Sequence, residues 1–141
     1  FFANSNKAHD GYLGDSVVGE WCNLGAGTSS SNVKNTAGEV RVWTLKGELA
    51  AGKKCGMFMG DYSKTAINTS INTGSVIGIG CNVFGAGLTP KYIPSFSWGV
   101  DGVQRYELDK LVTDIENWKK MKGQVISKDE ETILKYIYNN Y

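Results

Sequence analysis

Apolar and small side chains recur at every sixth residue through the middle of the chain. The positions with this spacing are Met59, Thr65, Ile71, Ile77 and Val83, and a shorter run holds Val18 and Leu24. A six-residue interval matches neither an α-helix nor an ordinary strand. It is typical of a chain that makes a short strand, turns a corner and repeats, with one side chain of each strand pointing inward. The pattern therefore predicts a mainly β protein, a parallel β-helix of the hexapeptide type.

The six-residue rhythm stops between residues 30 and 56. Residues 35–38 read Asn-Thr-Ala-Gly, a composition typical of a turn. Residues 40–44 then alternate in the way that one arm of a β-hairpin would. We therefore expect an ordered insertion that projects from one corner of the β-helix.

The rhythm returns until Leu88, after which Pro90 and Pro94 are expected to end the strand ladder, because proline cannot donate a backbone hydrogen bond. We assign residues 1–100 to the β-helix and residues 101–141 to a helical tail. Roughly half of the charged side chains lie in this tail.

Two segments of the tail have the apolar spacing of an amphipathic helix. The first carries Leu108, Leu111, Val112, Ile115 and Trp118. Gly123 is a suitable stop for this helix, and residues 127–130 read as a capping box that opens the second. We expect both helices to pack on the terminal coil or on a neighbouring subunit, with their charges on a solvated face.

Composition narrows the classes of partner. The chain has 15 basic and 14 acidic residues and a net charge of +1, which argues against nucleic-acid binding. It holds no long apolar run and opens with no signal-peptide pattern, so we expect no membrane partner and a cytoplasmic location. The 3 cysteines have no CxxC spacing and are expected to be reduced and buried. Since the sequence opens with Phe1 rather than Met, we expect it to be a piece of a longer chain.

The most specific string begins at the single histidine, His9. It continues through Tyr-Leu-Gly-Asp at residues 12–15 to Asn-Leu-Gly-Ala-Gly-Thr at residues 23–28. This string resembles the acetyltransferase domain of GlmU, the bifunctional bacterial enzyme that makes UDP-N-acetylglucosamine, in which the corresponding residues follow a His at the same offsets. The resemblance covers about residues 7–88 and includes Asn32. The tail, with PSFSWG followed by helices, is similar to that of GlmU-like putative sugar nucleotidyltransferases.

The resemblance implies a left-handed β-helix that forms a homotrimer, with active sites between subunits. It implies acetyl transfer from acetyl-CoA to the amine of an amino-sugar phosphate. His9 would be the general base, a role that suits imidazole near neutral pH. Tyr12, Asn23 and Asn32 would bind the amino-sugar phosphate.

The same resemblance implies that Ala26, Gly27 and Ala86 lie along acetyl-CoA. No metal site is expected in this chain, and Mg²⁺ would serve only a nucleotidyltransferase domain upstream of it. Two positions depart from the family pattern, Val33 in place of a Tyr and Ile67 in place of a Ser. These departures favour an alternative, a non-catalytic β-helix that trimerises or regulates a sugar-phosphate nucleotidyltransferase.

A third class, the β-helical carbonic anhydrases, requires a zinc site of three histidines. The single histidine of this chain excludes that class.

Overall fold

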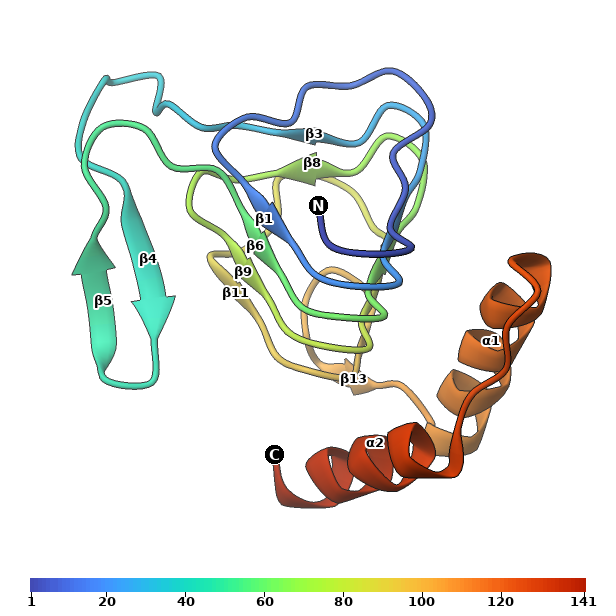
Figure 1. Ribbon diagram of the computed structural model, residues 1–141. Helices are drawn as coiled ribbons and strands as arrows, with labels where there is room; N and C mark the ends of the chain where they lie inside the picture. The colour runs from blue at the N-terminus through green and yellow to red at the C-terminus, as the bar shows by residue number, and fades with distance from the viewer.

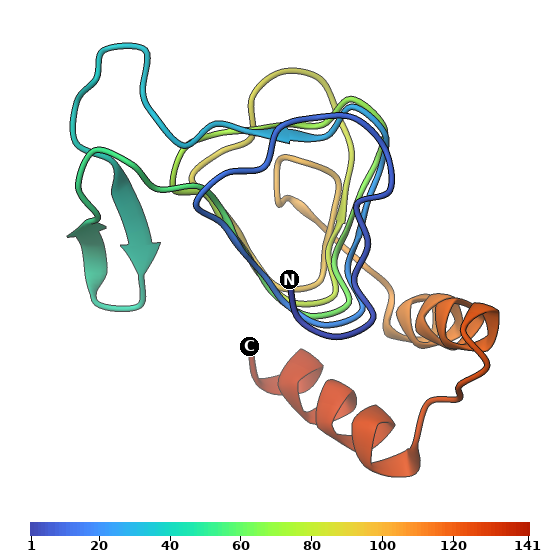
Figure 2. The ribbon, with the colours of Figure 1, turned by 45° about the horizontal axis from the view of Figure 1, so that its top comes forward.

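Two-residue strands separated by tight turns wind the chain into a parallel β-helix, which two α-helices follow (Figure 1). The computed structural model describes all residues, 1–141. Viewed more nearly along its axis, the coil has three sides (Figure 2). We name the three faces after their first strands, the β1, β2 and β3 faces.

Each face is a stack of hydrogen-bonded strands, and neighbouring strands are parallel except where stated. The β1 face holds β1 (Val17–Val18), β6 (Phe58–Met59), β9 (Val76–Ile77) and β11 (Tyr92–Ile93). The β2 face holds β2 (Asn23–Leu24), β7 (Lys64–Thr65), β10 (Asn82–Val83) and β12 (Ser97–Trp98), and β13 (Gln104–Arg105) pairs antiparallel with β12. The β3 face holds β3 (Ser29–Ser30) and β8 (Ser70–Ile71).

The residues at six-residue spacing form the core, as the sequence predicts. Met59, Ile71, Ile77 and Val83 are at most 3% exposed, and Thr65 is 5% exposed. Each is the second residue of its strand, and the strand register stacks it on its equivalent in the next layer, as in the pairing of Met59 with Ile77. A continuous apolar column therefore fills the coil.

The three cysteines are free and buried, as expected. Burial raises the pKa of each thiol, and it raises the pKa of Cys22 to about 11. Because the thiolate is the reactive form, we expect Ellman's reagent at pH 8 to modify the native chain at least ~100-fold more slowly than the chain in guanidinium. Release of thionitrobenzoate measures both rates. Fast stoichiometric labelling of the native chain would contradict this burial.

The expectation that Pro90 and Pro94 end the ladder is wrong, because β11 and β12 add a further layer on either side of Pro94. On the β1 face, the residue after each strand donates its backbone N–H to the next layer, as Gly78 does to the Ile93 carbonyl at 2.9 Å. Pro94 occupies the corresponding place in the last layer. No further strand follows there, so the missing donor costs no hydrogen bond.

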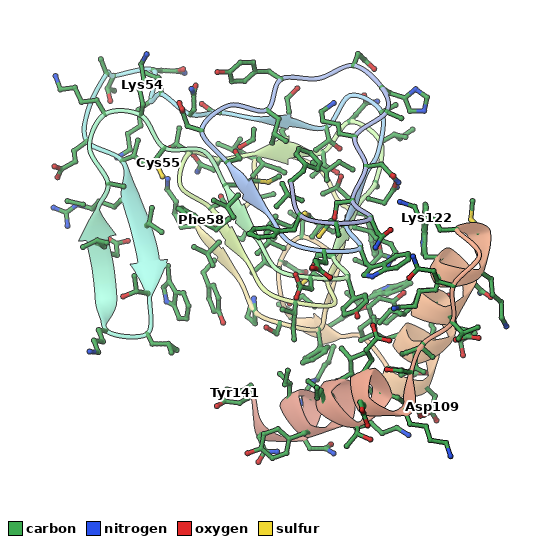
Figure 3. All side chains as sticks on the ribbon, in the orientation of Figure 1. Lys54, Cys55, Phe58, Asp109, Lys122 and Tyr141 are labelled. Carbon is green, nitrogen blue, oxygen red and sulfur yellow. The ribbon has the colours of Figure 1, made fainter.

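The insertion contains the expected hairpin, in which β4 (Arg41–Thr44) pairs antiparallel with β5 (Gly47–Ala50). It projects from the edge between the β3 and β1 faces, with Cys55 at its base (Figures 1 and 3). The Trp43 ring stacks on Tyr92 of β11, with centroids 3.7 Å apart and planes 11° apart. Buried Val40 and Val42 continue this contact, so the insertion is fixed to the coil by apolar packing.

Both helices form as the sequence predicts, α1 over Leu108–Met121 and α2 over Lys128–Asn140. The capping box of Ser127 and Glu130 is present, and Gly123 follows α1 at φ +70°. A second buried cluster joins the helices to their own coil. Its members are Phe96, Tyr106, Leu111, Ile115 and Leu134. Neither helix is long and apolar enough to cross a membrane.

One charged side chain of the tail is buried instead of lying on the expected solvated face. Lys119 is 3% exposed, and its Nζ lies 2.6 Å from Glu130 Oε1 and 4.5 Å from the ring centre of Trp21. Tyr62 of the coil donates a hydrogen bond to the same Glu130 oxygen at 2.9 Å. This polar cluster links α1, α2 and the coil, which helical periodicity alone could not reveal.

Candidate functional site

The turns between the β2 and β3 faces form a stacked column, which we call the β2/β3 edge. From the first layer to the last, its members are His9–Asp10, Ala26–Gly27, Ile67–Asn68 and Gly85–Ala86. Backbone bonds connect these layers, from Gly27 N to the Asp10 carbonyl at 3.2 Å and from Asn68 N to the Ala26 carbonyl at 2.7 Å. At the usual spacing between strands the column is about 14 Å long. The structure thus places His9 and the three predicted acetyl-CoA residues along one edge.

His9 lies exposed at the first end of this edge, and its imidazole makes no hydrogen bond within the chain. Its backbone is held by Lys7, whose Nζ donates to the His9 carbonyl at 2.9 Å and to the Asp10 carbonyl. No motif in the sequence points to Lys7. Its position two residues before His9 was the only signal for it. Lys7 is a positioning residue for the turn that presents the imidazole.

The Tyr12 hydroxyl and Asn32 lie together at the edge between the β3 and β1 faces, at the base of the insertion. Asn32 Nδ2 donates to the Tyr12 hydroxyl at 3.0 Å and to Asp15 Oδ2 at 2.7 Å. Tyr12 is 58% exposed, so its ring and hydroxyl remain accessible. Asp15 was not selected as a site residue, although it closes the Tyr-Leu-Gly-Asp string. It fixes the amide of Asn32 and thereby the orientation of the pair.

Asn23 lies apart from this pair, on the β2 face. Its Oδ1 accepts a hydrogen bond from Asn6 Nδ2 at 3.1 Å, and Asn6 Oδ1 accepts one from Lys122 Nζ at 2.9 Å. Lys122 follows α1 and reaches the first layer of the coil (Figure 3). Within one chain, Asn23 therefore lies on the β2 face, and the Tyr12–Asn32 pair lies at the opposite end of the β3 face from His9, where Cys55 N–H donates to the Asn32 carbonyl at 2.9 Å.

Local packing explains the residue types at two other positions of the edge. Gly27 has φ +72°, and a Cβ there would collide with the side chain of Asn68 in the next layer, so a glycine keeps the layers close. Ile67, which departs from the family pattern, is 70% exposed. It projects into solvent between Ala26 and Ala86, and it does not alter the core.

The fold and this edge define a class of protein, a parallel β-helix with one histidine at an exposed edge of small residues. No protein-family model matches the chain. Among curated proteins, the chain is similar to the bifunctional protein GlmU of Methanocaldococcus jannaschii, with 33% identity over 92 residues, or 65% of this chain and 22% of that protein.

Two further relatives have similar extents. The bifunctional sugar-1-phosphate nucleotidylyltransferase/acetyltransferase of Sulfurisphaera tokodaii is 36% identical over 81 residues, 57% of this chain and 20% of that protein. The bifunctional protein GlmU of Methanococcus aeolicus is 35% identical over 75 residues, 53% of this chain and 18% of that protein. The resemblance to GlmU-like proteins is confirmed, and the chain spans about a fifth of the length of these curated relatives.

Proposed function

We propose that the chain is an acetyl-CoA-dependent N-acetyltransferase domain that acts on an amino-sugar phosphate. The observation that carries this proposal is the shared edge of His9, Ala26 and Ala86. The name of the Sulfurisphaera relative, which includes acetyltransferase, supports the same reaction. The rest of the relatives' length would hold a nucleotidyltransferase that uses Mg²⁺, and the whole protein would work in the cytoplasm, where acetyl-CoA and sugar phosphates are made.

In the proposed reaction the chain supplies a base and a surface that orients the substrates. The amine nitrogen attacks the thioester carbonyl carbon, and His9 takes the proton that the nitrogen loses. As the C–S bond breaks, the same proton can pass to the leaving thiolate, so the products are an N-acetyl sugar phosphate and CoA. Tyr12 and Asn32 of a neighbouring copy in the trimer would hold the acceptor beside His9. The small side chains of Ala26 and Ala86 leave room along the edge for the extended thioester arm.

We also infer the left hand of the coil from this resemblance. The two-residue strands on three faces match the hexapeptide type of β-helix to which the resemblance assigns this hand. A left-handed coil runs against the usual right-handed crossover between parallel strands. The hand is therefore a specific property of this class.

We propose that the chain assembles as a homotrimer through its hairpin. Leu45 and Leu49 of the hairpin are 89% and 62% exposed, although both are large and apolar. A second copy packed against the hairpin would remove them from water.

The joint substitution of Leu45→Asp and Leu49→Asp is expected to shift the mass from trimer to monomer in size-exclusion chromatography with light scattering. Met121→Asp alters a side chain that is 77% exposed at the end of α1 and should leave the trimer intact. A trimer that survives the double substitution would refute this interface.

The direct test of the reaction is CoA release, followed chromatographically, from the chain given acetyl-CoA and a panel of amino-sugar 1-phosphates. We expect turnover with one member of the panel, which would identify the acceptor. If a folded, assembled chain released no CoA and did not bind acetyl-CoA, the proposal would fail. The β-helix would then be an assembly module.

A further inference from the structure

The end of helix α1 reaches back to the first layer of the coil through one side chain, that of Lys122 (Figure 3). Its Nζ donates to the Asn4 carbonyl at 2.6 Å and to Asn6 Oδ1 at 2.9 Å. Asn6 is 116 residues away from Lys122 in the sequence. The tail therefore has a polar contact with the first layer in addition to its apolar cluster.

Asn6 connects this contact to Asn23. The two residues are paired on neighbouring layers of the β2 face, and Asn6 Nδ2 donates to Asn23 Oδ1 at 3.1 Å. Backbone bonds hold both residues, because Asn6 N donates to the Cys22 carbonyl and Leu24 N donates to the Asn6 carbonyl, each at 2.9 Å. The freedom left to the pair is therefore rotation of the two side-chain amides.

The direction of these hydrogen bonds follows from the chemistry of Lys122. An ammonium group only donates hydrogen bonds, whereas an amide has one accepting oxygen and one donating nitrogen. Lys122 therefore requires the oxygen of Asn6, which turns the Asn6 nitrogen toward Asn23. Asn23 must then present its own oxygen to Asn6, and its Nδ2 is left over as a donor. We call this chain of contacts, Lys122–Asn6–Asn23, the amide relay.

The Nδ2 of Asn23 is available to a ligand. It makes no hydrogen bond within the chain, and the only buried side-chain nitrogen or oxygen without a partner is Ser30 Oγ, so Asn23 Nδ2 keeps access to solvent. Lys64 is the next residue along the β2 face, but its Nζ donates to the Tyr62 carbonyl at 3.1 Å. Asn23 lies three residues before Ala26 of the β2/β3 edge. A donor at this place suits an oxygen atom of a molecule bound at that edge.

We propose that Lys122 and Asn6 are positioning residues, which make Asn23 a hydrogen-bond donor to an oxygen atom of the acceptor. This inference rests on the proposed acetyl transfer, in which Asn23 would bind the acceptor. The relay also gives selectivity, because Asn23 offers no free oxygen to an ammonium group of a competing molecule. The helical tail then belongs to the substrate site as well as to the fold.

Asn6→Asp reverses the relay without breaking it. A carboxylate only accepts hydrogen bonds, so it keeps the bond from Lys122 but takes the Nδ2 of Asn23 in place of its oxygen. We expect the side-chain amide protons of Asn23 to exchange with water several-fold more slowly in this variant than in the parent chain. Nuclear magnetic resonance of the isotope-labelled chain, without any ligand, measures both rates. Equal or faster exchange in Asn6→Asp would overturn the relay.

Steady-state kinetics test whether the relay serves the acceptor. With the amino-sugar 1-phosphate that turns over, we expect Asn6→Asp to raise the KM for the acceptor at least ~5-fold, the usual effect of leaving a polar partner unpaired. The KM for acetyl-CoA should not change. Lys122→Met lets the Asn6 amide take either orientation, so about half of the molecules would keep the donor and the acceptor KM would rise about 2-fold.

Two further variants complete the kinetic test. Lys122→Arg should restore the parent KM, because a guanidinium group also only donates. Lys128→Met removes an exposed charge at the start of α2 and should change neither KM.

The outcomes separate this inference from the proposed function. Slower Asn23 exchange in Asn6→Asp with an unchanged acceptor KM would refute the role of the relay in binding. No turnover of any amino-sugar 1-phosphate by the parent chain would refute the proposed function and this binding role with it. The exchange rates would still decide whether Lys122 directs the amide of Asn23.

Discussion

Replacing His9 with alanine is expected to lower the rate of acetyl transfer by about 10²–10⁴-fold, the usual contribution of a general base. His9 is the only histidine, and its exposed imidazole has no hydrogen bond that would hold it away from a substrate. Loss of the base should reduce kcat far more than it raises the KM for acetyl-CoA, because the imidazole acts in the transition state. The rate of CoA release from the parent chain and from His9→Ala measures this difference.

The stability of the folded chain is one control for this substitution. Because His9 is exposed and contributes only its backbone to the packing of the edge, His9→Ala should leave the denaturant midpoint unchanged. Lys128→Met, which removes an exposed charge at the start of α2, should retain the parent activity. A His9→Ala chain that kept its activity within a few-fold would remove His9 from the mechanism. The base would then have to be sought elsewhere.

Replacing Glu130 with alanine is expected to lower the free energy of unfolding by about 2–3 kcal/mol, because it leaves a buried ammonium group without its partner. The Lys119 side chain is 4% exposed and that of Glu130 is 32% exposed, so the lysine cannot recover its hydration without moving α1. Chemical denaturation measures the change. The paired substitution of Lys119→Met with Glu130→Ala should recover part of the lost stability, since it removes the unpaired charge.

Glu131→Ala is the matched control, one residue away on α2. Glu131 pairs with Lys135 across one turn of the helix at the surface, and such a pair contributes about 0.3–0.5 kcal/mol. The two substitutions delete the same side chain from neighbouring positions. If they destabilised the chain equally, the cluster around Lys119 would have no special role in docking the tail.

The same cluster predicts how stability depends on pH. Burial raises the pKa of Glu130, but hydrogen bonds from Lys119, Ser127 and Tyr62 outweigh this effect and bring it to about 2, from an ordinary value of 4.5. Because the pKa is lower in the folded chain, the stabilisation is complete above about pH 4.5 and is lost as the pH falls toward 2. Glu130→Ala should therefore flatten the stability profile below pH 4.5 and leave its shape near neutrality unchanged.

The repeat in the sequence determined the coil because its spacing is a local property. A buried residue at every sixth position, as at Met59 and Ile77, needs only a short strand and a turn to be satisfied. Helix α2 was equally local, since its capping box lies within four consecutive residues. The string from His9 to residue 28 likewise indicated one edge, because residues about a coil apart return to the same turn.

Only the tertiary structure decided which polar groups meet across the layers. Pro94 costs no ladder hydrogen bond because it lies in the last layer of the β1 face, and a sequence does not show which layer is last. Lys119 is buried because the coil supplies Tyr62 and Trp21 beside it, from positions 57 and 98 residues away. Such contacts depend on long-range register, which local periodicity does not encode.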